Sequence, residues 1–134
     1  MIMSKKKLVS ILLSAVLCFG MLGSTFSASA AHVTVHLTKT QAVNSSSNVH
    51  GSFKYYWGKN SKSSKYSVYY IARYKHNGVW FTGGSTLLAA GREIDEAHAI
   101  KTERLDYETD WFLKLNPQGA GTKDCDAWGY MKNA

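Results

Sequence analysis

The feature that most constrains the fold is Asn77-Gly78, which separates two runs rich in aromatic and β-branched residues. A type I′ turn needs positive φ at both central residues, and Asn-Gly is the pair that accepts this best. The sequence therefore predicts a β-hairpin from Tyr66–His76 and Val79–Thr82, with Lys75 opposite Trp80. The side chains expected on its core face are Tyr66, Val68, Tyr70, Ala72, Tyr74, Val79 and Phe81.

Other segments also alternate between apolar and polar residues, which is typical of half-buried strands. They are His32–Thr38, Val49–Trp57, Leu105–Tyr107, Trp111–Leu115 and Ala127–Lys132. Gly58–Lys65 is predicted to be a basic loop, and Gly83–Gly91 a turn followed by a short strand. Arg92–Arg104 fits a helix or a strand, and we favour a strand. The chain is thus expected to be all-β, a small antiparallel β-sandwich of about six to eight short strands.

The first thirty residues have the organisation of a secretory signal peptide. Three lysines precede an apolar run, and Ala28-Ser29-Ala30 forms a small-residue cleavage site. We therefore predict a cleaved signal peptide over residues 1–30 and one secreted β domain over residues 31–134. The expected location is extracellular, with no transmembrane segment in the mature chain.

Charge is distributed unevenly along the mature chain. Residues 31–75 contain seven lysines and arginines and no acid, whereas residues 76–134 contain six bases and nine acids. Such asymmetry favours an anionic partner, although it also serves solubility. Outside the cell the expected partner is an anionic cell-envelope polymer or a lipid headgroup. A protein partner is possible and nucleic acid is disfavoured.

The residues that usually carry catalysis or metals are poorly arranged here. On a strand, His32 and His36 lie about 13 Å apart, too far for a shared metal. Cys125 is flanked by two aspartates, which raise a thiol pKa, so we expect a buried structural cysteine. No nucleophile elbow or phosphate loop is present. We predict no catalytic residue, metal or cofactor.

Two groups of side chains remain as candidate sites. Carboxylates at Asp106, Glu108 and Asp110 alternate on one run, which keeps a small hydrolase as an alternative. The preferred candidate is a basic, aromatic sheet face, since bases beside rings bind phosphates joined to a sugar or ring. Its predicted residues are Lys54, Tyr56, Lys59, Lys62, Lys65, Tyr69, Arg73, Lys75 and Trp80.

Two stretches, "HGSFKYYWGKNSKSSKYSVYY" and "AHAIKTERLDYETDWFLKL", resemble the secreted lactococcin-type bacteriocins of Gram-positive bacteria. The resemblance covers about Val49–Leu115, and its matching residues are Tyr55, Tyr56, Gly58, Lys62, Lys65, Tyr66, Ser67 and Val68. It implies a small β-sandwich that acts on the envelope of competing bacteria, and it implies no catalytic residues.

These observations predict a secreted bacteriocin-like protein that binds an anionic envelope component. The alternative is a secreted, non-enzymatic inhibitor or interaction module that binds a protein partner.

Overall fold

The computed structural model describes residues 32–103, 108–119 and 121–133. The predicted signal peptide and the predicted strand at Leu105–Tyr107 lie outside the described residues. Of the helical structure that is described, none has both the length and the apolar character needed to cross a bilayer.

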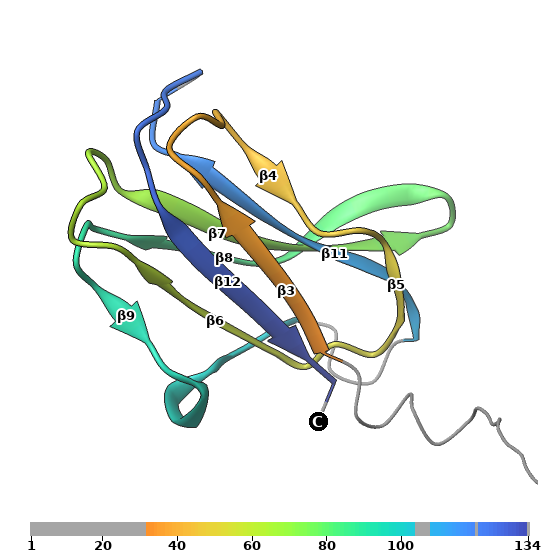
Figure 1. The fold of residues 1–134 in the computed structure, drawn as a ribbon. Helices are drawn as coiled ribbons and strands as arrows, with labels where there is room; N and C mark the ends of the chain where they lie inside the picture. The colour runs from red at the N-terminus through yellow and green to blue at the C-terminus, as the bar shows by residue number, and fades with distance from the viewer. Residues whose placement is uncertain (1–31, 104–107, 120, 134) are drawn as a thin grey trace, which may run out of the picture. The chain divides into compact units, whose positions relative to one another are not determined.

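The described chain forms two five-stranded antiparallel sheets (Figure 1). The first, called the β6 sheet, has the order β10 (Ile100–Lys101), β6 (Tyr55–Asn60), β12 (Ala127–Lys132) and β3 (His32–Leu37), with β9 (Glu93–Ile94) also paired to β6. The second, called the β7 sheet, has the order β4 (Asn44–Ser45), β11 (Thr109–Pro117), β7 (Val68–His76) and β8 (Val79–Leu88), with β5 (Val49–Gly51) also paired to β11. The all-β sandwich predicted from the sequence is confirmed.

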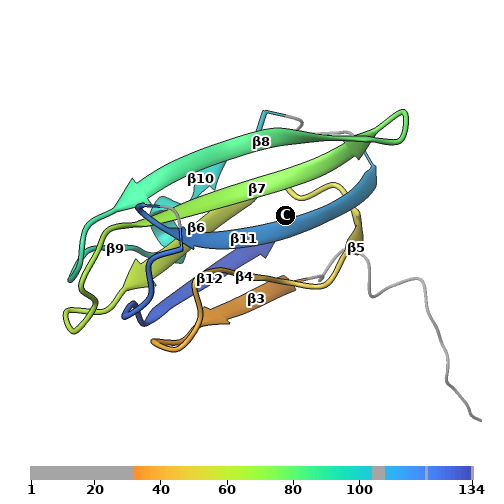
Figure 2. The ribbon, with the colours of Figure 1, turned by 90° about the horizontal axis from the view of Figure 1, so that it is seen from above.

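The two sheets pack face to face, and Figure 2 shows them as two layers. Alternate residues of each long strand are buried between the layers, as the pleat of a strand requires. Glycine allows the closest approach: a Cβ at Gly129 would lie 2.8 Å from Leu115 Cδ2 and 2.9 Å from Leu113 Cδ2. The largest fully buried side chains are Trp111, Tyr56, Tyr70, Phe53, Leu37, Leu113, Leu115, Met131 and Val68.

The predicted hairpin is present with its predicted register. Asn77 and Gly78 have φ of 52° and 78°, and Lys75 is paired with Trp80. The pairing shifts by one residue between Ala72 and Arg73, because Gly83 is the extra residue of a β-bulge. The hairpin and the register next to its turn follow from the type I′ turn that Asn77 and Gly78 form.

The core face predicted for this hairpin was wrong at the two ends of the hairpin. Val79, Phe81 and Tyr66 were expected in the core, but their exposed fractions are 55%, 43% and 38%. The hairpin tip extends beyond the other strands, so Val79 and Phe81 have no opposite layer to pack against (Figures 1 and 2). Tyr66 precedes β7 and lies in the connecting loop.

The single strand predicted over Val49–Trp57 is in fact two strands in different sheets. β5 pairs with β11, whereas β6 pairs with β12. Phe53 lies between them and is completely buried, so the chain crosses from one layer to the other at this residue. The crossing changes which side chains face inward, and Tyr56 is only 1% exposed.

Two further predicted boundaries differ from the structure. β8 continues through the two glycines to Leu88, so Gly83–Gly91 is mostly strand. Arg92–Arg104 was predicted as a strand, and its described part contains β9, the short 3-10 helix η2 (Glu96–His98) and β10. Asp95 begins the helix because its side chain accepts a hydrogen bond from His98 N.

The cysteine at position 125 is buried, as the sequence predicts. Cys125 is fully buried, and its Sγ donates to the carbonyl of Tyr66 at 3.4 Å. It therefore fills space and ties the segment before β12 to the loop before β7.

Two buried tyrosines give opposite predictions for removal of a hydroxyl. Burial raises the pKa of both Tyr70 and Tyr56. In the described structure Tyr70 Oη has no hydrogen-bond partner, whereas Tyr56 Oη lies 2.8 Å from Thr86 Oγ1. We expect Tyr70→Phe to leave the free energy of unfolding unchanged or higher, and Tyr56→Phe to lower it by about 1 kcal/mol. Urea unfolding of both variants measures the contrast, and an equal loss would contradict the assigned hydrogen bonds.

Candidate functional site

The outer surface of the β7 sheet carries a group of cationic and aromatic side chains. Val68, Tyr70, Ala72 and Tyr74 of β7 point into the core, so the residues between them point outward. We call the resulting surface the β7 outer face. It includes Tyr69, Ile71, Arg73, Lys75, Trp80, Leu87, Phe112 and Lys114, and Asp110 of β11 lies on the same side, 3.0 Å from His50 Nδ1.

The rings and cations of this face contact one another. The rings of Trp80 and Phe112 meet edge to face, with centroids 4.8 Å apart and planes at 73°. Lys75 Nζ lies 5.5 Å from the centroid of the Trp80 ring, which is the cation–π contact that the hairpin register predicts. Arg73, between β8 and β11, is paired with Phe112 and Thr82.

Arg73 is the least satisfied charge of this face. Its Nη2 donates to the carbonyl of Trp80 at 3.3 Å, and its Nε is buried without an acceptor in the described structure. None of the described carboxylates lies within ion-pair distance of it. A half-buried guanidinium normally has an anionic partner, because desolvation of an unpaired charge is costly. An incoming anion would supply this partner.

The outer surface of the β6 sheet is also aromatic, and its His36 has a carboxylate partner. His36 stacks on Trp128 at 3.8 Å with ring planes 3° apart, and its Nε2 lies 2.7 Å from Asp126 Oδ1. Trp57 stacks on Tyr130 with centroids 5.5 Å apart. The His36 imidazole therefore already has a hydrogen-bond partner within the protein.

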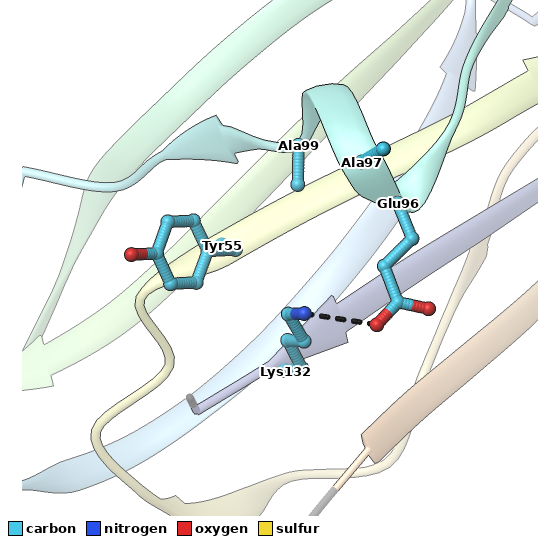
Figure 3. Close-up of a pocket in the computed structure, with 5 residues that line it drawn as sticks. All are labelled: Tyr55, Glu96, Ala97, Ala99 and Lys132. Carbon is cyan, nitrogen blue, oxygen red and sulfur yellow. Dashed lines mark hydrogen bonds and ion pairs between the residues drawn. The ribbon is translucent and has the colours of Figure 1, made fainter.

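A hollow of about 290 Å³ lies beside this sheet and is lined by Tyr55, Glu96, Ala97, Ala99 and Lys132. Lys132 Nζ lies 2.8 Å from Glu96 Oε2 (Figure 3). The same ammonium lies 5.7 Å from the centroids of the Tyr55 and Trp57 rings. Lys132 is consequently engaged by the protein itself, unlike Arg73.

The acidic residues of the β9–η2 segment form local contacts. A second hollow, of about 310 Å³, is lined by Glu93, Ile94, Asp95 and His98. His98 Nδ1 lies 2.7 Å from Asp95 Oδ1, and this hydrogen bond holds the pKa of the Asp95 carboxyl below its usual range. Asp95 thus caps the short helix.

The other chemical candidates are dispersed. Asp110 lies 3.0 Å from His50 Nδ1, and Asp106 of the predicted carboxylate trio is outside the described residues. In the part of the chain that the structure describes, no three His, Cys, Asp or Glu side chains are grouped closely enough to hold a metal ion. His32 and His36 both lie on β3, the strand predicted for them.

The structure brings together only some of the predicted site residues. Tyr69, Arg73, Lys75 and Trp80 share the β7 outer face. Tyr56 does not belong to any surface, because it lies in the core and contacts Thr86. Its assignment to the site was wrong, and the cause is the unforeseen crossing at Phe53.

The predicted lysines are distributed over other parts of the domain. Lys59 is exposed on the β6 sheet opposite Trp128. Lys62 and Lys65 are exposed in the loop between β6 and β7. Lys54 is half-buried between β5 and β6, with its N–H bonded to Lys132 O. Lys62 and Lys65 thus lie on the loop predicted for them, whereas Lys59 was expected on that loop and lies on β6, and Lys54 does not lie on the β7 outer face with Arg73.

Several residues of the β7 outer face were missed by the sequence analysis. Phe112 and Lys114 alternate with the buried Trp111, Leu113 and Leu115 of β11. That alternation was visible in the sequence, but the neighbouring strand that places Phe112 beside Arg73 was not.

Searches against protein-family models, curated proteins and solved structures found no match for this chain.

The Lys132–Glu96 contact generates a pH prediction. The hydrogen bond from Lys132, together with its charge, lowers the pKa of the Glu96 carboxyl. A carboxyl with a lowered pKa contributes stability above its unfolded pKa, and this contribution is lost as the pH falls through the folded value. We expect Lys132→Met to return the Glu96 pKa toward its ordinary value in an NMR titration. Lys101→Met, a matched change on β10, should leave it in place, and equal effects would contradict the contact.

Proposed function

We propose that this protein is an exported, non-enzymatic binding protein that takes an anionic component of the bacterial envelope on the β7 outer face. The observation that carries the proposal is Arg73, a half-buried guanidinium without a carboxylate partner in the described structure. An oxyanion of the ligand would neutralise it, with charge-assisted hydrogen bonds that are stronger than neutral ones.

The aromatic side chains around Arg73 narrow the chemistry of the ligand. Phe112 is the cross-strand neighbour of Arg73 and contacts Trp80, and Lys75 adds a second cation at the Trp80 ring. Flat rings contact the apolar face of a sugar or a ring, whereas the two cations contact a phosphate or carboxylate. A ligand that joins a phosphate to a sugar face fits this combination best.

The resemblance to lactococcin-type bacteriocins supports the same class of target. It is carried by residues such as Tyr55, Tyr56 and Gly58, which lie at the start of β6. Those residues support the sandwich, since Tyr56 is buried and a Cβ at Gly58 would lie 2.6 Å from Trp128 O. Action against competing bacteria is part of the proposal.

Binding to isolated Gram-positive cell walls tests this function. We expect sedimentation of the mature protein with the walls, and weaker binding as ionic strength rises. Arg73→Gln should weaken binding about tenfold or more, because a hydrogen bond to a charged group is worth about 1.5–3 kcal/mol. Trp80→Ala should also weaken it.

Two variants on the opposite sheet serve as controls for this experiment. Trp128→Ala removes an exposed tryptophan from β12, and Lys101→Gln removes an exposed charge from β10. Neither should change binding to the walls. Wall binding with an affinity unchanged by Arg73→Gln and Trp80→Ala would reject the β7 outer face as the site.

A protein partner is the second candidate, and the edge of the β7 sheet favours it. β8 is an outer strand of ten residues without a charged side chain, and Leu87 is 41% exposed on it. Uncharged edge strands pair readily with another strand. Gly83 O already accepts from Glu103 N, which occupies one edge group.

This second candidate predicts a stoichiometric complex from culture supernatant. Ser85→Pro on the exposed edge strand should abolish the complex, because proline removes an N–H and obstructs strand pairing. Analytical size exclusion of the recovered complex gives the readout, and circular dichroism checks that the variant is folded. A complex that is unaffected by a folded Ser85→Pro variant would reject pairing through β8.

A further inference from the structure

One end of the sandwich gathers half of the lysines and arginines of the described chain. This end lies away from the tip of the β7–β8 hairpin and consists of the loops that follow β3, β6, β8 and β11 (Figure 1). We call it the basic end. Its cations are Lys39, Lys59, Lys62, Lys65, Arg92 and Lys123, and all six are exposed.

Backbone hydrogen bonds bring the chain at Lys39, Lys65 and Lys123 together. Asp124 N donates to Lys39 O at 3.0 Å, and Lys65 N donates to Asp124 O at 2.9 Å. Lys123 immediately precedes Asp124 in the chain. Three loops that are distant in sequence therefore meet at Asp124, and each carries one exposed lysine.

A second set of bonds brings the other three cations to the same end. Asn60 N donates to Arg92 O at 2.9 Å, between Lys59 and Lys62. The Asn60 side chain is buried, and its Nδ2 donates to the carbonyls of Tyr66 and Leu88. These bonds fix the loop between β6 and β7 against the end of β8.

The six cations have few competing acids. In the described part of the chain no carboxylate forms an ion pair with any of them. Asp126 is engaged by His36, which leaves Asp124 and Glu93 as the nearby carboxylates. The described acids Glu103, Glu108 and Asp110 belong to segments at the opposite ends of the strands. A long anion is thus steered toward the basic end.

The shape of this end favours a chain over a small ion. The cations are exposed and come from four separate segments, and neither described hollow is lined by any of them. Five of the six are lysines, whose ammonium groups act as point charges for phosphate on flexible stems. Several weak contacts of this kind add up only when one ligand carries many anions.

We propose that the basic end is a second binding site, and that it takes a linear phosphodiester polymer. The site is separate from the β7 outer face and does not depend on it. The ligand proposed for the basic end is a polymer with many phosphates, whereas the β7 outer face requires only one anionic group beside a ring or sugar.

Binding of lipid-free poly(glycerol phosphate) tests the proposal. We measure affinity for the mature protein by titration calorimetry over a range of salt concentrations. The triple variant Lys62→Gln, Lys65→Gln, Lys123→Gln should weaken binding. It should also make the slope of log affinity against log salt less negative by about 2–3, because each lost phosphate contact releases about one counterion fewer.

Two controls make the result specific. The triple variant Lys54→Gln, Lys101→Gln, Lys132→Gln removes the same charge from residues outside both proposed sites and should keep most of the affinity and slope. Monomeric glycerol phosphate at equal phosphate concentration should compete poorly. Equal losses in the two triple variants, equal competition by the monomer, or equal binding of poly-glutamate would each overturn the proposal.

The same variants separate this site from the proposed function. Arg73→Gln with Trp80→Ala should leave binding of poly(glycerol phosphate) unchanged. If that double variant loses wall binding while the basic-end triple variant has normal polymer affinity, the proposed function survives and the basic end is rejected. If the double variant keeps normal wall binding while the basic-end triple variant loses polymer affinity, the β7 outer face is rejected and the basic end is retained.

Discussion

The structure depends on the close approach of two sheets at positions where one strand has no side chain. Gly129 of β12 lies against Leu113 and Leu115 of β11, and Gly58 of β6 lies against the ring of Tyr70. Larger residues at these glycines would force the layers apart, because a close-packed core cannot absorb added volume cheaply. The inner faces are thereby filled, and the charged side chains of the described residues lie on the outer faces and in the loops.

The two outer faces then differ in how they treat their polar groups. On the β6 sheet Lys132 is bonded to Glu96, and His36 is bonded to Asp126. On the β7 sheet Arg73 donates to the backbone carbonyl of Trp80, and the rings of Trp80 and Phe112 lie on the same face. Both surfaces contain tryptophan and cations, so composition does not distinguish them. The difference lies in Arg73, which has no carboxylate within ion-pair distance among the described residues.

Lysines that are far apart in the sequence lie at one end of the domain, because antiparallel strands bring their connecting loops to the same two ends. Lys39, Lys65 and Lys123 are far apart in sequence, yet the backbone of Asp124 connects them. The proposed envelope binding and the proposed polymer site therefore use different regions: a face with rings and few cations, and an end with many cations. A polymer that carries both phosphates and sugars has groups for each.

The sequence by itself determined the local structure. Period-two alternation and Asn77-Gly78 predicted β7, the start of β8 and their register, because turn geometry and the pleat depend on neighbouring residues. Only the tertiary structure decided the crossing at Phe53, the burial of Tyr56, the exposure of Phe81, and the separation of Lys59 from Arg73. Each of these depends on which strands lie opposite one another, and that pairing is set by contacts between residues distant in the chain.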